Sequence, residues 1–161
     1  MLIMLCGCIT LNNDHQYQIP DILSYNDSVC HSYGGLPDSN CTPGSVNESI
    51  TQYNIQETIC VSGYTDKVRP STDYTNLLKE QSIKDYGYLD TNMSHYEFDH
   101  LIPLSIGGHP TYGNNLWAEY GDIPNDKDAV ENRCHRMVCN GEITLKQAQQ
   151  EIASDWRIAC R

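Results

Sequence analysis

The residues best suited to chemistry lie in one stretch, YEFDHLIPLSIGGHPTYGNNLWAE, which covers residues 96–119. Asp99 and His100 stand side by side, a Gly-Gly turn follows them, and Asn115 lies on the return. A carboxylate supplies the oxygen ligand that hard divalent cations favour. A neutral imidazole beside it can take a proton from water, and an amide can orient that imidazole without adding charge. The stretch is therefore either a polar surface hairpin or half of a metal-dependent active site.

A second polar set lies on the helix that we predict over residues 126–141. Its members recur at i, i+3, i+4 and i+7, a spacing that aligns side chains on one ridge: Asp128, Glu131, Asn132 and His135. The opposite, apolar stripe consists of Val130, Cys134, Met137 and Val138. Taken alone, each set also fits a solvated face or a structural histidine. Together, a strand that carries Asp-His and a helix that offers another His match a centre that holds one divalent cation beside a general base.

The elements that carry these residues have clear local signals. A helix is predicted over 71–87, with Thr72 or Asp73 as its cap and apolar contacts from Leu77, Leu78 and Ile83. YEFDHLIP and NNLW read as the two strands of a hairpin, and ETICVSGYT (57–65) reads as a short strand. Asn125 or Asp126 caps the helix at 126–141, and a last helix begins at Thr144. The expected fold class is α+β.

The charge distribution limits the partners that the chain can bind. The chain has 161 residues, the length of one domain, and its formal net charge of −11 argues against a general nucleic-acid coat. Residues 1–66 contain no Lys or Arg, so any polyanion must dock on the remaining part. We therefore expect affinity for nucleic acid to be weak or assisted by metal. No apolar run approaches the length of about 20 residues that a membrane-spanning helix needs.

The eight cysteines point to an oxidising compartment. The start, MLIMLCGC, resembles the end of a bacterial lipoprotein signal, which makes Cys8 a candidate for lipidation and residues 1–8 a truncated signal segment. If cleavage occurs before Cys8, six cysteines remain besides the lipidated one, an even number suited to three disulfides: Cys30, Cys41, Cys60, Cys134, Cys139 and Cys160. Pairs 41–60 and 139–160 are plausible because they flank recognisable elements, but fifteen pairings are open, and Cys134 also fits a buried apolar position. A cytosolic protein with free thiols is the alternative.

The motif DHLIPLSIGG followed by NNLW resembles the signature of the HNH endonuclease family. The resemblance to bacterial HNH-domain proteins extends to CTPGSVN, ICVSGYTDKVRP, HRMVCNG and QAQQEIASDW, and it covers roughly residues 41–157. It implies a ββα-metal (His-Me finger) core with additional helices. The nuclease domain would then occupy 58–161, after an irregular, acidic and disulfide-tied N-terminal region at 9–57.

The resemblance also implies a role for each site residue. Asp99 corresponds to the metal ligand on the strand, His100 to the general base, and Asn115 to the residue that positions the base. His135 corresponds to the metal ligand on the helix, with Glu131 or Asn132 as alternatives. The nearest candidates for phosphate contacts are Lys127, Arg133 and Arg136.

The function implied by the resemblance is hydrolysis of DNA phosphodiester bonds with low sequence specificity. The expected cofactor is one divalent ion, Mg²⁺ first and Mn²⁺ or Zn²⁺ as alternatives. DNA is the expected substrate, RNA is the alternative, and the chain is expected to be an extracytoplasmic monomer, secreted, periplasmic or held by a lipid anchor. The competing hypothesis is a disulfide-stapled envelope or binding module that keeps the scaffold without catalysis.

Overall fold

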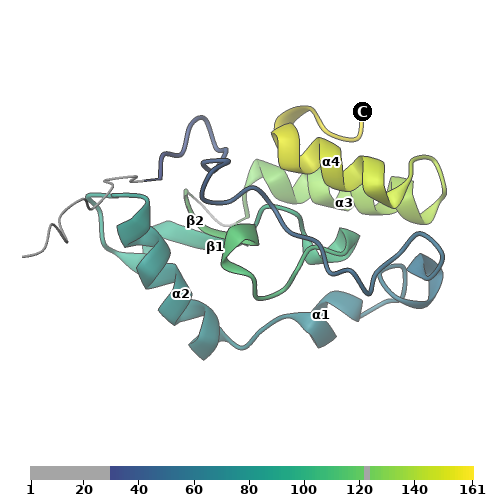
Figure 1. The fold of residues 1–161 in the computed structure, drawn as a ribbon, viewed down its shortest axis with the longest axis horizontal. Coiled ribbons are helices and arrows are strands. Elements are labelled where there is room, and N and C mark those ends of the chain that lie inside the picture. The colour runs from purple at the N-terminus through teal and green to yellow at the C-terminus, as the bar shows by residue number, and fades with distance from the viewer. Residues whose placement is uncertain (1–29, 122–123) are drawn as a thin grey trace, which may run out of the picture.

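The fold consists of four α-helices and one two-stranded antiparallel sheet, as described by a computed structural model over residues 30–121 and 124–161 (Figure 1). The helices are α1 (Tyr64–Val68), α2 (Thr72–Asp85), α3 (Asp126–Cys139) and α4 (Leu145–Asp155). The strands are β1 (Tyr96–His100) and β2 (Leu116–Tyr120). Short 3₁₀ turns connect them, at Ile55–Glu57, Met93–His95, Leu104–Ile106, Gly113–Asn115 and Trp156–Ile158. This architecture confirms the α+β class.

The β1–β2 hairpin stands between α2 on one side and the α3–α4 pair on the other (Figure 1). Its register pairs Glu97 with Glu119 and Asp99 with Trp117. Residues directly opposite each other in an antiparallel pair project from the same face, so two carboxylates of β1 and one of β2 share a face. The hairpin thus gathers acidic side chains next to the start of α3.

The long hairpin connection at 101–115 folds tightly because of the Gly-Gly pair. Gly107 has a φ of +76°, a backbone conformation that favours glycine. A Cβ on Gly108 would collide with the carbonyl group of Ile102, and the Gly108 amide donates to the Pro103 carbonyl at 2.9 Å. Larger residues at these two positions would open the connection and displace the strand ends.

Helix α2 packs against the strands through its second half. Ser71 caps it by accepting a hydrogen bond from the Tyr74 amide, one residue before the predicted caps. Ile83 is buried with Tyr96 and Ala118, and the Ser82 hydroxyl accepts from the Ala118 amide at 2.9 Å. The predicted contact from Leu77 is wrong, because that side chain is 72% exposed.

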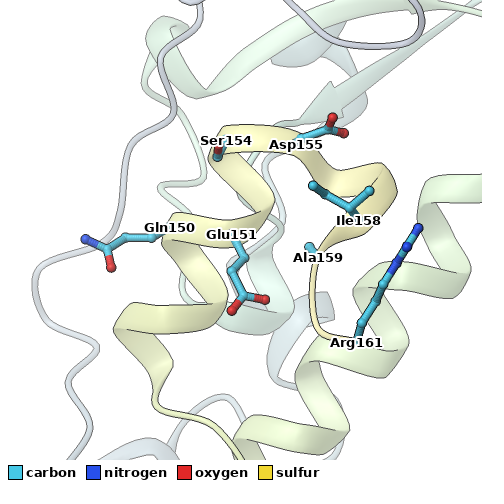
Figure 2. A pocket seen from close by; sticks show the side chains of 7 residues that line it. All are labelled: Gln150, Glu151, Ser154, Asp155, Ile158, Ala159 and Arg161. Atoms are coloured by element: carbon cyan, nitrogen blue, oxygen red, sulfur yellow. The ribbon is translucent and has the colours of Figure 1, made fainter.

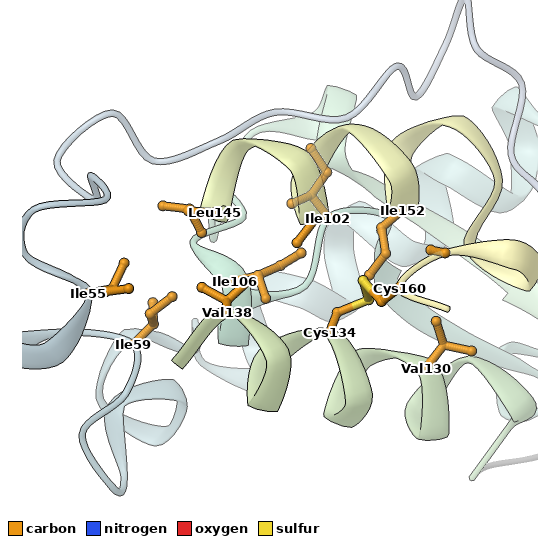
Figure 3. Packing of buried hydrophobic residues seen from close by; sticks show 12 residues of the cluster. Ile55, Ile59, Ile102, Ile106, Val130, Cys134, Val138, Leu145, Ile152 and Cys160 are labelled. Atoms are coloured by element: carbon orange, nitrogen blue, oxygen red, sulfur yellow. A yellow bond between two sulfur atoms is a disulfide. The ribbon is translucent and has the colours of Figure 1, made fainter. Parts of the chain in front are cut away.

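Helices α3 and α4 form the main hydrophobic core together with the segment at 55–60 and the hairpin connection (Figure 3). Asn125 begins α3 with a full capping box that includes Asp128, and the Thr144 hydroxyl caps α4. The predicted stripe of α3 is largely buried, since Val138 and Cys134 are fully covered and Val130 nearly so. None of the helices in the described ranges is long and apolar enough to cross a membrane.

The strand predicted at 57–65 is wrong. The amide of Cys60 donates to the Ile55 carbonyl and that of Val61 to the Thr58 carbonyl, so the segment closes into successive turns. Gly63 then takes a left-handed conformation and begins α1. An extended segment needs a neighbouring strand for its amides, and here local carbonyls and burial of Ile59 take that role.

Three disulfides join Cys30 to Cys41, Cys60 to Cys139 and Cys134 to Cys160. All six cysteines predicted to form disulfides do so, but the pairs 41–60 and 139–160 are wrong. Cys134 lies on α3 directly beneath the C-terminal segment, and its bond to Cys160 crosses the core (Figure 3). The disulfides indicate an oxidising environment. Cys8 and residues 1–8 lie outside the described residues.

The disulfide between Cys60 and Cys139 is expected to contribute more to stability than the one between Cys30 and Cys41. It spans 79 residues, whereas the Cys30–Cys41 bond spans 11. Chain-entropy estimates give about 4.5 kcal/mol for Cys60→Ser/Cys139→Ser and about 3 kcal/mol for Cys30→Ser/Cys41→Ser. Urea denaturation of both double variants checks this order, and a larger loss in the second variant would contradict it.

Candidate active site

His100 ends β1, and its imidazole is held in one orientation. The side chain is buried, and Nε2 lies 3.0 Å from the Pro110 carbonyl oxygen. A carbonyl can only accept, so Nε2 carries the hydrogen and Nδ1 keeps its lone pair. Burial lowers the pKa of His100, against the opposing effect of the Pro110 carbonyl. The imidazole is therefore neutral near pH 7 and able to accept a proton.

Asn115 holds the hairpin connection rather than the imidazole itself. Its fully buried amide donates to the carbonyls of Ile102 and His109 at 3.0 and 3.1 Å. Its Oδ1 accepts from the amides of Ile102 and Ser45 at 3.0 and 3.2 Å. The expected hydrogen bond from this amide to His100 is therefore wrong. Asn115 instead fixes the loop that carries the Pro110 carbonyl, the hydrogen-bond partner of the His100 ring.

His109 stabilises the same loop. Its Nδ1 accepts hydrogen bonds from the amides of Thr111 and Tyr112 at 3.3 and 3.2 Å, and its ring stacks on Tyr112 with centroids 3.5 Å apart. These contacts close a turn around Pro110. Asn115 and His109 thus both hold the loop that carries the Pro110 carbonyl, the hydrogen-bond partner of the His100 ring.

Next to His100, the ammonium group of Lys127 lies among two carboxylates and a carbonyl. Its Nζ lies 2.8 Å from Asp99 Oδ2 and 2.5 Å from Glu131 Oε1, and it donates to the His100 carbonyl at 2.9 Å. Only 1% of the lysine side chain is exposed. Burial opposes its charge, but Asp99 and Glu131 outweigh burial and raise the pKa of Lys127. The lysine is therefore charged and clamps β1 to the first turn of α3.

Carboxylates exceed cations around this lysine. The Asn125 amide donates to Glu97 and Glu119 at 3.1 and 3.3 Å, so these two facing acids lie close together. Burial, and then the charge of Asp99, raises the pKa of Glu119 to about 8. Burial also raises the pKa of Glu131 to about 7, although Lys127 opposes it. One ammonium thus does not neutralise all of the nearby acidic residues. We call these residues the acidic cluster: Glu97, Asp99, Glu119, Asp128 and Glu131.

Asp99 and Glu131 are the members of the acidic cluster that could hold a divalent cation, and the Lys127 ammonium contacts both of their carboxylates. Asp99 Oδ2 is buried without a partner in hydrogen-bonding geometry, so its contact with the Lys127 ammonium is electrostatic. Oxygen ligands in a site with excess negative charge are what Mg²⁺ and Mn²⁺ favour. Of the three helix candidates, Glu131 is the one whose carboxylate contacts the same ammonium as Asp99.

His135 does not fit the same centre. It lies eight residues, or about 12 Å of helix, beyond Lys127 on α3. Its Nε2 lies 2.9 Å from the Ile59 carbonyl oxygen, beside the Cys60–Cys139 disulfide. His135 is thus bound to Ile59, and the hydrogen bonds of the described residues include none between His135 and Asp99. Asn132, the other alternative, is exposed on the same ridge and makes no side-chain hydrogen bond within the described ranges.

The predicted phosphate contacts change in the structure. Lys127 is buried in its ion pairs, and the Arg133 guanidinium donates to the carbonyls of Cys160 and Ala159 at 2.7 and 2.8 Å. Neither is free at the surface to meet a phosphate. Arg136 is exposed and remains a candidate.

Sequence reasoning missed Arg69. This exposed residue lines a polar cleft of about 510 Å³ that also includes Asp128, Glu131 and His135. Its charge lowers the pKa of both Glu97 and His100, although burial outweighs that effect at Glu97. Arg69 therefore lies near the base and the acidic cluster. Arg69 lies between the predicted strand at 57–65 and the predicted helix at 71–87, and no motif there marked it as a site residue.

A second hollow of about 440 Å³ lies at the end of α4, around Gln150, Ser154 and Ile158 (Figure 2). Its acids already have partners. Glu151 accepts a hydrogen bond from the Cys160 amide at 2.7 Å, and Asp155 binds Arg157. This hollow offers no free base or metal ligand set among its lining residues, so the chemistry of the described chain concentrates at the acidic cluster.

The raised pKa of Glu119 predicts a pH dependence of stability. A carboxyl group with a folded-state pKa of about 8, against 4.5 when unfolded, contributes stability below pH 4.5 that is lost as the pH rises to 8. In EDTA, the melting temperature of Glu119→Gln minus that of the wild type should therefore increase as the pH rises from 4.5 to 8. The exposed Glu57→Gln variant serves as the control. If this difference in melting temperature for Glu119→Gln stays constant over the same pH interval, the burial of an uncompensated carboxylate is contradicted.

Comparison with known proteins adds no relative to this description. No protein-family model, no curated protein and no solved structure matches the chain. The candidate site therefore rests on the geometry and chemistry of its own residues.

Proposed function

We propose that the chain is a metal-dependent endonuclease that hydrolyses DNA phosphodiester bonds with low sequence specificity. The observation that carries this proposal is the imidazole of His100, whose Nε2–H is held by the Pro110 carbonyl next to a cluster of buried carboxylates. A neutral base with a fixed lone pair beside oxygen ligands is what metal-assisted hydrolysis requires. The proposed HNH-type core is the β1–β2 hairpin with α3.

Each residue then has a defined task. His100 takes a proton from the attacking water through Nδ1. Asp99 and Glu131 hold a divalent cation, which supplies positive charge against the charge that develops on the phosphate. Lys127 binds both of these carboxylates and holds them together. Arg69 binds a phosphodiester oxygen at the edge of the cleft.

The charge of the chain favours a weak and metal-assisted encounter with DNA. Its net charge of −11 repels a polyanion, and the described cations of the cleft do not form a continuous basic surface. The described helices include none that presents a row of basic residues to a groove of DNA. Low sequence specificity follows, and the disulfides are consistent with action outside the cytoplasm.

Plasmid nicking tests the proposal. Purified protein is incubated with supercoiled plasmid, and in parallel with single-stranded DNA and RNA, in Mg²⁺, Mn²⁺ or Zn²⁺. We expect nicked plasmid with 5′-phosphate and 3′-hydroxyl ends in at least one metal. If all three substrates stay intact under every metal, the proposal fails.

A non-catalytic, disulfide-stapled binding module is the second candidate function. It is favoured by the position of the Lys127 ammonium, which lies between the two carboxylates assigned to the cation. If this ammonium replaces the metal permanently, the chain binds no Mn²⁺ at Asp99. Electron paramagnetic resonance titration of Mn²⁺ with wild type and Asp99→Asn separates the two functions, because only the nuclease gains a bound ion that the variant lacks.

A further inference from the structure

A second group of metal-ligating side chains lies away from the acidic cluster. The ligand atoms of Cys60, His135 and Cys139 all lie within 4.8 Å of one another. It is the single such group of three or more His, Cys, Asp or Glu side chains found within residues 30–121 and 124–161. In the oxidised chain its two sulfurs are joined as a disulfide and cannot act as thiolate ligands.

The three side chains stay together for reasons other than the disulfide. The His135 ring bonds to the Ile59 carbonyl at 2.9 Å, and the Gln56 amide donates to the Cys139 carbonyl at 3.0 Å. Ile59 is buried in the main core, and His135 and Cys139 are one turn apart on α3. Opening the S–S bond therefore leaves both sulfurs near the imidazole.

The hydrogen bond of His135 also prepares the ring for a metal. A carbonyl only accepts, so Nε2 carries the hydrogen and Nδ1 keeps the lone pair that a metal ion requires. Metal-binding histidines generally donate their other ring N–H to such a partner, which fixes the tautomer. Two thiolates and one imidazole are a ligand set that selects Zn²⁺ over Mg²⁺.

We propose that Cys60, His135 and Cys139 form a thiol-gated zinc site, closed while the disulfide is intact and formed when it is reduced. A dithiol reductant supplies two electrons and two protons, so the S–S bond breaks, two protein thiols form, and the reductant becomes a disulfide. Zn²⁺ then binds the two sulfurs and His135, and the two thiol protons are released to solvent. Neither Asp99 nor His100 takes part, so the zinc site does not depend on the proposed nuclease activity.

The other two disulfides provide internal comparisons. Cys134 and Cys160 are at most 1% exposed, whereas Cys60 and Cys139 are half-buried and line or adjoin the polar cleft. A soluble dithiol therefore has better access to the Cys60–Cys139 bond, since exchange requires attack on an accessible sulfur. In the described ranges, no His, Cys, Asp or Glu side chain forms such a three-ligand group with Cys30 and Cys41.

The test measures the zinc that the protein gains on reduction. Wild-type protein is treated with an immobilised dithiol, separated from it without oxygen, and titrated with Zn²⁺; native mass spectrometry counts bound zinc before and after. We expect one additional Zn²⁺ per chain after reduction. With Co²⁺ as the probe, we expect thiolate-to-metal charge-transfer absorption that the oxidised protein lacks.

Matched variants assign the gained zinc to these residues. Reduced Cys60→Ser/Cys139→Ser should gain no zinc, Cys30→Ser/Cys41→Ser should still gain one, and His135→Ala should bind it about tenfold or more weakly. Far-UV circular dichroism confirms that each variant is folded. Equal zinc in the oxidised and reduced wild type, an unchanged gain in Cys60→Ser/Cys139→Ser, or unchanged affinity in His135→Ala would each overturn the proposal.

Discussion

His100→Ala is expected to slow DNA nicking by about 10²- to 10⁴-fold, the range by which a positioned general base accelerates a reaction. The imidazole is neutral near pH 7 because burial lowers its pKa, and its Nδ1 lone pair is unused within the described residues. Alanine removes the proton acceptor and leaves the carboxylates of the acidic cluster in place. The measurement is the initial rate of plasmid nicking in Mg²⁺ at pH 7.5.

A matched control separates loss of chemistry from loss of fold. His31 is an exposed histidine whose side chain makes no hydrogen bond to the hairpin within the described residues, so His31→Ala should nick plasmid at the wild-type rate. His100→Gln fills more of the buried space than alanine and should be as inactive as His100→Ala. A wild-type rate in either His100 variant would remove this residue from the mechanism.

Lys127→Met is expected to lower the free energy of unfolding by about 3–5 kcal/mol, the cost of removing one partner from a buried ion pair. Methionine keeps most of the length of the side chain but leaves Asp99 and Glu131 without the ammonium that both contact. It also leaves the His100 carbonyl without its lysine donor. Chemical denaturation in EDTA measures the loss.

The same variant reports on the metal centre. Mn²⁺ should raise the denaturation midpoint of Lys127→Met more than that of wild type. An ion that binds only the folded state stabilises that state. The control is Lys84→Met, which breaks the exposed pair with Glu80 and should cost no more than about 0.5 kcal/mol. Equal losses in the two lysine variants would show that the acidic cluster is not electrostatically coupled to Lys127.

The elements could be predicted from the sequence because their signals are local. Asn125 and Gly141 bracket α3, and Thr144 begins α4, since a cap depends on a few neighbouring residues. The hairpin followed from two short strand patterns around a Gly-Gly turn. Such signals say where an element begins and ends, and the structure confirms them for α2, α3 and α4.

The site was predicted only in part, because its members meet through tertiary packing. The ridge of α3 offered four candidates, and only packing against β1 places Glu131 and Lys127 near Asp99 and His135 near Ile59. A lysine read from the sequence is a surface charge by default, so the burial of Lys127 had no signal.

The disulfide pairing and Arg69 had no local signal either. Cys60 and Cys139 are separated by 79 residues, and only the fold brings them together. Arg69 directly follows α1 and lines the cleft, and the N-cap of α1, Gly63, lies within the stretch where sequence patterns predicted a strand. Long-range geometry of this kind leaves no periodicity in the sequence.

The most direct test of the nuclease proposal is the removal and return of metal during plasmid nicking. Wild-type protein is freed of metal with EDTA, mixed with supercoiled plasmid, and supplied with Mg²⁺ in excess of the chelator, beside Asp99→Asn/Glu131→Gln as the variant without the assigned ligands. We predict intact plasmid in EDTA, nicking when Mg²⁺ returns, and no nicking by the variant in either condition. Nicking that continues in EDTA, or equal nicking by wild type and variant, would contradict a metal centre at Asp99 and Glu131.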